Sequence, residues 1–370
     1  MSKIKCLNLS GFKTIRDIQD LQFDDINIFI GANGSGKSNI ISFFEMISYM
    51  MTKGFGKFVS DNGFASSMLY HGQKVTQDIE AKINFESNNT KSFYQFKIYH
   101  TIDDRFLFES EVIQQIHKTN DKSKTESLLD TGYKETKLRD IYTTNRTAKN
   151  IKDLLSSIRV FHFHDTSRTA YMHIARPLES NSYLLSDGGN IASFLYKLKH
   201  KEPKYYERIL SYVKQVAPFL DDFVLEPVGD SIQLRFKEVN SDLQLGSFRL
   251  SDGIVRFICL ATLLLQPRQS LPNILMIDEP ELGLHPVAID ILSEMINIAS
   301  INSQIFITTQ SPRLIDQFEP KNIIVINRKQ DDDGRYCSDF EKFTDKGLSS
   351  WLEDYSLADM WDSNILGGRP

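Results

Sequence analysis

The sequence predicts an α/β fold with a mostly parallel sheet, and two observations support this class. From residue 273 onward, apolar stretches typical of strands alternate with helical stretches, as in NILMI, QIFIT and NIIVI with helices expected from 287 and 312. Near the N-terminus, the apolar stretch INIFI (26–30) precedes a glycine-rich loop and then SNIISFFEMISYMM, whose apolar residues have helical spacing. Such alternation favours a parallel sheet covered by helices, because parallel neighbours need a crossover connection.

Composition is that of a globular protein. The 370 residues are 41% hydrophobic and 25% charged, enough to bury a sizeable core in one large or two ordinary domains. The net charge of −5 argues against general nucleic-acid binding, so contact with DNA would need a local basic patch. Three scattered cysteines indicate neither a disulfide framework nor a zinc site, and we expect a cytoplasmic protein. No targeting segment is visible, and the apolar run 257–265 is too short to span a membrane.

The middle of the chain predicts two further kinds of structure. Residues 79–86, 91–99 and 105–113 have the pattern of an antiparallel meander. Two amphipathic helices are expected at 187–200 and 203–216, and the second begins with a proline, which suits a first helical turn.

The stretch GANGSGKS at 31–38 is the strongest chemical signal. It fits G-x-x-x-x-G-K-[ST] at every fixed position and lies between a strand and a helix, so the alternative of a chance glycine turn does not explain its context. Backbone N–H groups of such a P-loop bind phosphate oxygens, while Lys37 is placed to reach the β- and γ-phosphates and Ser38 to ligate Mg²⁺. The expected nucleotide-binding residues are Gly31, Asn33, Gly34, Ser35, Gly36, Lys37, Ser38 and Asn39.

A second motif, NILMIDEPELGLHP at 273–286, ends an apolar strand with two adjacent carboxylates. Asp278 is expected to hold Mg²⁺ through its water shell, and Glu279 to polarise the water that attacks the γ-phosphate. The alternative is a solvated acidic turn, which the preceding buried strand disfavours. The stretch 326–333 supplies no Asn-Lys-x-Asp guanine-binding motif, so we expect ATP as the nucleotide.

Five stretches, in order, resemble a known family: IKCLNLSGFKTIRD, GANGSGKSN, LSDGIVRF, LMIDEPELGLHP and FITTQSP are similar to the ATPase heads of the RecF and SMC (structural maintenance of chromosomes) branch of ABC ATPases. They resemble most the compact members without coiled coils from bacterial overcoming-lysogenisation-defect-like and anti-phage systems. The resemblance implies an ABC-type P-loop NTPase head with a mixed sheet, an antiparallel meander in lobe I and a helical signature-motif lobe. The expected parts of this single composite domain are the P-loop lobe with the meander (1–116), a polar surface insertion (117–157), the helical lobe (158–272), the acidic motif and switch region (273–345) and a C-terminal tail (346–370).

The resemblance also implies a role for LSDGIVRF at 250–257. In ABC-type heads, the signature serine and glycine of one subunit face the γ-phosphate held by the other, so that two ATP molecules are sandwiched in a head-to-tail dimer. Ser251 and Gly253 are therefore expected to complete the ATP site of a partner subunit. The residues themselves agree, because serine is a good N-cap and the N–H groups of a helix N-terminus can bind an anion. An ordinary helix cap is the alternative.

The family's switch position is usually histidine, and here it is Gln310 in ITTQSP. Glutamine can hydrogen-bond a γ-phosphate or a water but carries no positive charge, so slow hydrolysis is expected. A simple polar residue at a strand end is the alternative. In FHFHDTS, His162 and His164 share one face of a strand near the position of the ABC Q-loop, but two ligands are too few to predict a metal site.

The predicted function is that of an ATP- and Mg²⁺-dependent ATPase that dimerises head to tail on ATP, as a homodimer or a higher oligomer. We expect it to act as a sensor or scaffold controlling a separately encoded effector protein in bacterial anti-phage defence, without a membrane partner. The alternative is a RecF-like DNA-binding clamp in repair. Basic residues that could contact a phosphate backbone, or form a solvated helix face, are Lys199, Lys201, Lys204, Arg208 and Lys214.

Overall fold

The computed structural model describes residues 2–52, 54–87, 90–117, 123–127, 132–141, 146–343 and 354–368. One six-stranded sheet, called the central sheet below, has the order β17-β16-β3-β15-β14-β8. Five of its strands, β3, β8, β14, β15 and β16, are parallel to one another, and the edge strand β17 pairs antiparallel with β16. The bounds are β3 (Ile26–Ile30), β8 (Ile158–Phe161), β14 (Ile274–Asp278), β15 (Gln304–Thr309), β16 (Ile323–Gln330) and β17 (Tyr336–Lys342).

A second six-stranded sheet, called the meander sheet below, is antiparallel throughout and has the order β2-β1-β4-β5-β6-β7. It contains the meander expected from the sequence. The bounds are β1 (Lys3–Phe12), β2 (Ile15–Gln22), β4 (Asp78–Glu86), β5 (Thr90–His100), β6 (Phe106–His117) and β7 (Ser123–Ser127). Burial alternates along β4, because one face of this sheet packs on the core and the other faces solvent.

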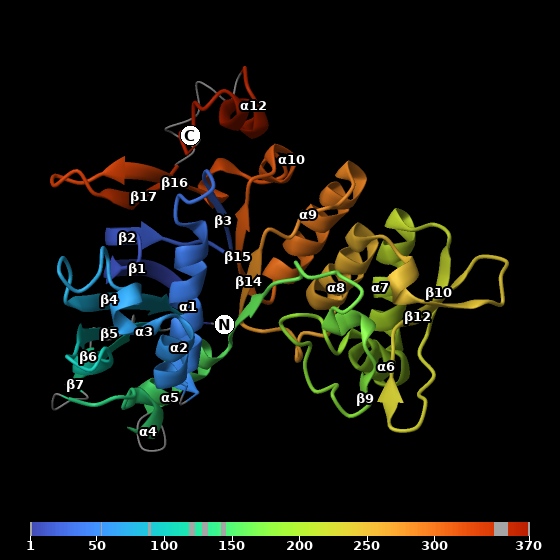
Figure 1. Cartoon of the computed structure of the whole chain (residues 1–370), viewed down its shortest axis with the longest axis horizontal. Coiled ribbons are helices and arrows are strands. Elements are labelled where there is room, and N and C mark those ends of the chain that lie inside the picture. The colour runs from blue at the N-terminus through green and yellow to red at the C-terminus, as the bar shows by residue number, and fades with distance from the viewer. Residues whose placement is uncertain are drawn as a thin grey trace.

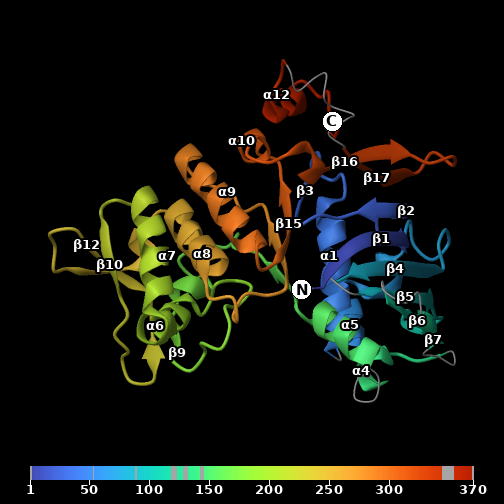
Figure 2. The same ribbon diagram turned by 180° about the vertical axis from the view of Figure 1, so that it is seen from behind.

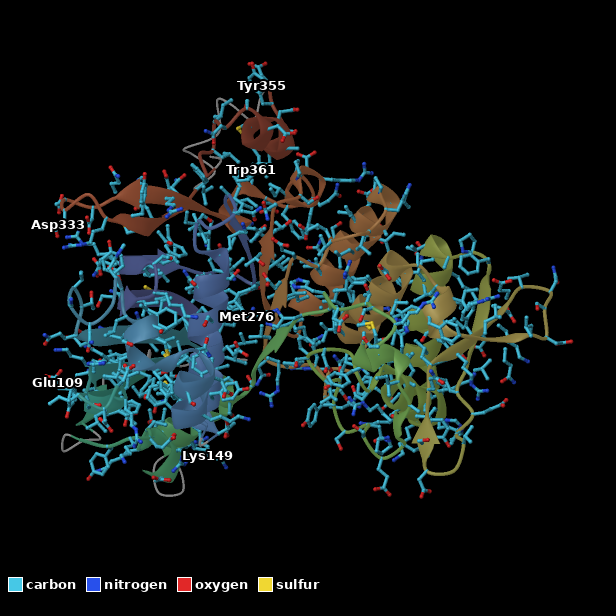
Figure 3. The ribbon with its side chains drawn as sticks, in the orientation of Figure 1. Glu109, Lys149, Met276, Asp333, Tyr355 and Trp361 are labelled. Carbon is cyan, nitrogen blue, oxygen red and sulfur yellow. The ribbon has the colours of Figure 1, made fainter. Side chains whose placement is uncertain are left out.

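The central sheet separates two hydrophobic cores. Alternate residues of β3 and β15 enter different cores: Ile28 and Ile307 face one, and Phe29 and Phe306 the other. Strands that are buried on both faces have continuous apolar sequences, which is why these stretches were recognisable as strands. In Figure 1, α1 (Lys37–Met51) lies between the central sheet and the meander sheet. Met276 of β14, labelled in Figure 3, belongs to this same core.

The other core joins the central sheet to the helical lobe and the C-terminal tail. Figure 2 shows the helical lobe on the side of the central sheet opposite the meander sheet. Its main helix is α8 (Asp252–Leu265), in which every residue from Val255 to Leu265 is buried, so the longest apolar run of the sequence is a core helix. Among the described residues, the longest apolar helices fall short of what crossing a membrane requires.

The remaining elements are short or cover these cores. Beside the meander sheet lie α2 (Phe55–Asp61), α3 (Phe64–Met68), α4 (Leu138–Ile141) and α5 (Arg146–Ser156). The helical lobe also contains η1 (Tyr171–His173), β9 (Arg176–Pro177), α6 (Ile191–Lys201), α7 (Pro203–Val216), β10 (Leu220–Val224), β11 (Ser231–Ile232), β12 (Arg235–Glu238), β13 (Gln244–Gly246) and η2 (Ser247–Arg249). After β14 come α9 (Pro286–Ser300), α10 (Pro312–Ile315), η3 (Pro320–Asn322) and α12 (Leu357–Asp362).

The sequence predicted a polar surface insertion at 117–157, but the last part of this segment, α5, packs against the core. In α5, Ile151, Leu154 and Leu155 are buried in the core that contains α1. These residues form an apolar stripe at helical spacing, which the many polar neighbours obscured in the sequence.

Residues 118–122, 128–131 and 142–145 of this segment lie outside the described part of the chain, as do 346–353 and 369–370 of the expected tail. In the tail, Trp361 is buried against the second core (Figure 3).

Candidate nucleotide-binding site

The P-loop connects β3 to α1 at the edge of the central sheet where its parallel strands end. Two of its glycines have positive φ, 78° at Gly34 and 117° at Gly36, a backbone conformation that favours glycine. A Cβ at Gly36 would collide with Ser338 of β17, whereas one at Gly34 would meet nothing within 4 Å. The loop is therefore packed tightly against β17 at one glycine and open at the other.

Lys37 lies inside this loop and is only 6% exposed. Its ammonium donates hydrogen bonds to the carbonyls of Gly31 (2.7 Å) and Ala32 (3.1 Å). Burial lowers the pKa of Lys37, and the nearby carboxylates of Glu279 and Asp278 partly oppose this shift. The structure thus brings the lysine of the P-loop close to both carboxylates of the second motif.

Asp278 is the last residue of β14, and its register partner in β15 is Thr308. The Thr308 hydroxyl donates to Asp278 Oδ1, and the N–H of Glu279 donates to the Thr308 carbonyl (3.0 Å). Burial by itself raises the pKa of Asp278, but the adjacent His162 imidazole and the hydrogen bond from Thr308 outweigh it, so the net pKa lies below its usual value. Asp278 is therefore held as an anion that could bind a cation at neutral pH.

Gln310 joins residues from three separate parts of the chain. Its side-chain amide donates to Asn33 Oδ1 of the P-loop (2.8 Å) and to Glu279 Oε1 (2.8 Å). This meeting follows from the sheet, because β3, β14 and β15 are parallel and their carboxyl ends share one edge. A water or phosphate oxygen at this place would meet a carboxylate and an amide together.

A polar network fixes the outer side of the P-loop. Ser338 donates to the Ser35 carbonyl (2.5 Å), and the hydroxyls of Thr14 and Ser338 lie 2.6 Å apart. Asn39, expected to contact nucleotide, donates to Thr14 Oγ1 (2.6 Å) and so also supports the loop. Beside the loop is a pocket of about 260 Å³ lined by Lys13, Thr14, Gly34, His71, Arg328, Tyr336, Cys337 and Ser338.

The residues present fit a magnesium nucleotide. The Ser35 hydroxyl is buried and has no hydrogen-bond partner among the described residues, so it is available to a ligand. Ser38 is exposed on the first turn of α1. The hydroxyl of Ser38 and the carboxylate of Asp278 are oxygen ligands of the kind that Mg²⁺ prefers. With Lys37 they could hold a phosphate chain and its metal ion.

The signature residues Ser251 and Gly253 lie at the start of α8 in the helical lobe, outside the group of residues around the P-loop. Ser251 is the N-cap of α8, is exposed, and makes no side-chain capping hydrogen bond. At Gly253, a Cβ would collide with the carbonyl of Gly283, so the helix start packs closely on the loop after β14. Among the described residues, no hydrogen bond joins Ser251 or Gly253 to the P-loop of the same chain.

Two charged residues near the site, Arg256 and Glu281, were not predicted from the sequence. Arg256 is buried in α8 and donates to the carbonyls of Phe163 (2.8 Å), His164 (3.2 Å) and Leu282. The sequence does contain a signal for Arg256, because a charged residue within the apolar stretch of α8 needs buried hydrogen-bond partners. Glu281 is half-buried, with its carboxylate oxygen Oε2 shielded from solvent; Oε1 accepts from the Thr309 hydroxyl (2.5 Å), and burial raises the pKa of this carboxyl.

The histidines have distinct positions. His162 Nδ1 lies 3.6 Å from Asp278 Oδ2, and His164 Nε2 lies 2.9 Å from the Asp278 carbonyl oxygen. The FHFHDTS stretch is therefore adjacent to the acidic motif. His285 instead caps α9 by accepting from the N–H of Val287 (3.3 Å).

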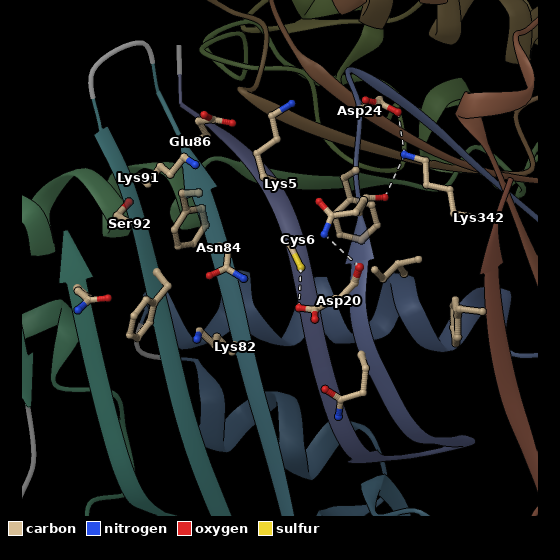
Figure 4. A pocket seen from close by; sticks show the side chains of 18 of the residues that line it. Lys5, Cys6, Asp20, Asp24, Lys82, Asn84, Glu86, Lys91, Ser92 and Lys342 are labelled. Carbon is tan, nitrogen blue, oxygen red and sulfur yellow. Dashed lines mark hydrogen bonds and ion pairs between the residues drawn. The ribbon is translucent and has the colours of Figure 1, made fainter. Parts of the chain in front are cut away.

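Two other surfaces lie apart from this site. A concave region of about 1130 Å³ lies over the outer face of the meander sheet and the neighbouring β17 (Figure 4). It has mixed charge, with Lys342 paired to Asp24 at 2.7 Å. In the basic stretch of the helical lobe, Lys199 is paired with Asp222 (2.8 Å) and Lys214 with Asp221 (3.4 Å). Neither surface presents a uniformly basic face.

Comparisons with known proteins agree with this geometry. Residues 26–316 match the family described as AAA domain, putative AbiEii toxin, Type IV TA system. The structure of the Smc head bound to the C-winged helix domain of ScpA is 15% identical with a TM-score of 0.55, and the match covers 94% of this chain and 99% of that one. The Smc head domain with an extended coiled coil bound to the C-terminal domain of ScpA, from Pyrococcus furiosus, is 14% identical with a TM-score of 0.57, covering 96% and 99%.

The matched range contains the P-loop, the signature stretch, the acidic pair and four of the six strands of the central sheet, β3, β8, β14 and β15. The likeness to the two Smc heads extends over almost the entire chain and shows the same fold. The chain therefore belongs to the AAA domain family described as putative AbiEii toxin, Type IV TA system, and it has the fold of the Smc head domains.

Proposed function

We propose that the chain hydrolyses ATP at composite sites formed by two copies arranged head to tail. One observation carries this proposal: Lys37, Asp278, Glu279 and Gln310 assemble at one edge of the central sheet, while Ser251 is exposed on the helical lobe with no capping bond of its own. A helix N-terminus with free N–H groups favours an anion. A second copy can supply that anion as the γ-phosphate bound at its own P-loop.

Each residue at the sheet edge has a definite task in this proposal. Lys37 contributes positive charge to the β- and γ-phosphates, and Glu279 accepts a proton from the attacking water. The Gln310 amide, already bonded to Glu279, orients that water without adding charge, so turnover is slow. Ser38 and Asp278 would hold Mg²⁺, which would supply positive charge to neutralise the phosphates.

We further propose that dimer closure controls a separately encoded effector protein in anti-phage defence. Both Smc heads named above are described as bound to a domain of another protein, ScpA, which supports a partner protein over isolated action. The family description, which names a putative toxin of a toxin–antitoxin system, supports a defence role. The RecF-like DNA clamp is less supported, because two of the candidate basic residues, Lys199 and Lys214, are paired with aspartates.

The dimer is tested in a background that binds ATP but does not hydrolyse it. Glu279→Gln is expected to form a stable dimer with ATP, measured by light scattering coupled to size exclusion. Adding Ser251→Arg should abolish that dimer, because the longer side chain fills the space for a γ-phosphate. Adding Ser211→Arg, the same substitution on an exposed part of α7, should leave it intact.

Trans action is tested by mixing two inactive proteins. Ser251→Arg and Lys37→Ala place both lesions in one composite site of a heterodimer, so the second site is wholly wild type. Recovery of ATPase activity in the mixture would demonstrate trans action. A Ser251→Arg protein that stays monomeric with ATP yet hydrolyses at the wild-type rate would refute the composite site.

A further inference from the structure

The loop after β8 and the end of β14 bring three potential metal ligands together. The parallel register pairs Phe161 with Ile277, so the next residues, His162 and Asp278, leave the sheet side by side. His164 follows two residues later in the same loop, beyond the end of β8 rather than on a strand as the sequence predicted, and its ring centroid lies 6.0 Å from that of His162. One ligand atom from each of the two histidines and from Asp278 lies within 4.8 Å of the others, and the described part of the chain holds no other such group of three.

The backbone of this loop is held in place. Phe163, between the two histidines, is buried, and the N–H of His162 donates to the Ser186 carbonyl (3.0 Å). The buried Arg256 side chain donates to the carbonyls of Phe163 and His164. The backbone that carries both imidazoles is therefore held by contacts that leave the His162 ring nitrogens and His164 Nδ1 free of these bonds, and such preorganisation favours a metal site.

The distances suit two ligands of one ion. Two donors about 2.1 Å from a tetrahedral ion lie about 3.4 Å from each other. The 3.6 Å between His162 Nδ1 and Asp278 Oδ2 is close to that separation and is longer than an ordinary hydrogen bond. His164 Nε2 can donate to the Asp278 carbonyl, which leaves the lone pair on Nδ1; this tautomer is typical of a metal ligand supported by a backbone carbonyl.

The donor set indicates the class of ion. Mg²⁺ and Ca²⁺ prefer oxygen ligands, whereas two imidazoles and a carboxylate suit zinc, cobalt, manganese and iron. The side chains are accessible, since His162 is 42% and Asp278 17% exposed. We propose that His162, His164 and Asp278 form a binding site for a first-row transition-metal dication, with its remaining coordination positions open to water or another ligand.

This site is distinct from the predicted Mg²⁺ site in its histidine ligands but shares the Asp278 carboxylate with it. Binding of the transition metal therefore requires no nucleotide and does not depend on ATP hydrolysis or dimerisation. Because the two ions use one carboxylate, a bound transition metal withdraws Asp278 from Mg²⁺.

The test is a metal titration of the full, tag-free chain without nucleotide. Zn²⁺ binding is measured by calorimetry, and Co²⁺ binding by the visible absorption of its d–d bands. We expect one ion per chain, with affinity reduced at least about tenfold by His162→Gln and by His164→Gln, since even outer-shell partners of metal ligands contribute tenfold or more. His200→Gln, a histidine on α6 that bonds to the Tyr196 carbonyl, is the matched control and should bind as the wild type does.

Two results would overturn the site. One is a wild-type affinity for Zn²⁺ and Co²⁺ in both His162→Gln and His164→Gln. The other is a cobalt spectrum with thiolate charge-transfer bands, which would assign the ion to cysteine instead. Nucleotide binding by the same proteins is measured separately, so failure of the metal site leaves the proposed ATPase function to be judged by its own experiments.

Discussion

Glu279→Gln separates chemistry from binding at the nucleotide site. The substitution keeps the size and shape of the side chain and replaces one carboxylate oxygen by an amide. The backbone of Glu279 has a φ of 43°, and the N–H of the residue bonds to Thr308. Glutamine has the same branching as glutamate, so this backbone conformation should persist.

Two effects of this change differ greatly in size. The Gln310 amide donates to Glu279 Oε1 at 2.8 Å, and a bond to a charged acceptor is worth about 1 kcal/mol more than one to a neutral acceptor. That loss alone would change an equilibrium by about fivefold, whereas removing a general base lowers kcat by about 10²- to 10⁴-fold. We therefore expect ATP affinity to remain within about an order of magnitude and turnover to fall far more.

The assay combines steady-state phosphate release with equilibrium binding of ATP. Glu281→Gln is the comparison variant, because it makes the same chemical change two residues away, at a buried carboxylate bonded to Thr309. Turnover should fall far more in Glu279→Gln than in Glu281→Gln. Equal turnover in the wild type and Glu279→Gln would show that another group activates the water.

Two further predictions concern the charges buried at the site. Lys37→Ala should weaken ATP binding by about 10- to 100-fold, the value of a charged hydrogen bond, while thermal unfolding stays cooperative; normal binding by the folded variant would contradict the P-loop assignment. Burial raises the pKa of Glu281 above its usual value of 4.5, so ionising this carboxyl lowers the stability of the folded chain as pH rises through that value. Glu281→Gln removes the charge and should therefore increase the free energy of unfolding by about 1–3 kcal/mol at pH 8 and by less near pH 4.5. Urea titrations at the two pH values measure this difference. A gain that does not change with pH would indicate better packing rather than removal of a buried charge.

Local patterns in the sequence were sufficient for the main elements of the site. GANGSGKS after an apolar strand, and Asp278–Glu279 at the end of another, depend on residues that are neighbours along the chain. The structure has the β3–loop–α1 unit and the strand β14 at these places. The segment 146–156 was expected to belong to a polar surface insertion, but it forms a helix with one buried face. A narrow apolar stripe on one helix face is hard to recognise in a sequence that is mostly polar.

Contacts between distant segments depended on strand order and register, which local patterns do not encode. The sequence by itself determined the P-loop, the acidic pair and the alternation of strands and helices, because each is set by short-range spacing and side-chain type. Only the tertiary structure decided that Gln310 bonds to both Asn33 and Glu279, and that His162 lies beside Asp278. The physical reason is that parallel strands from separate parts of the chain end at one edge of the sheet, where residues up to 277 positions apart come within hydrogen-bond distance.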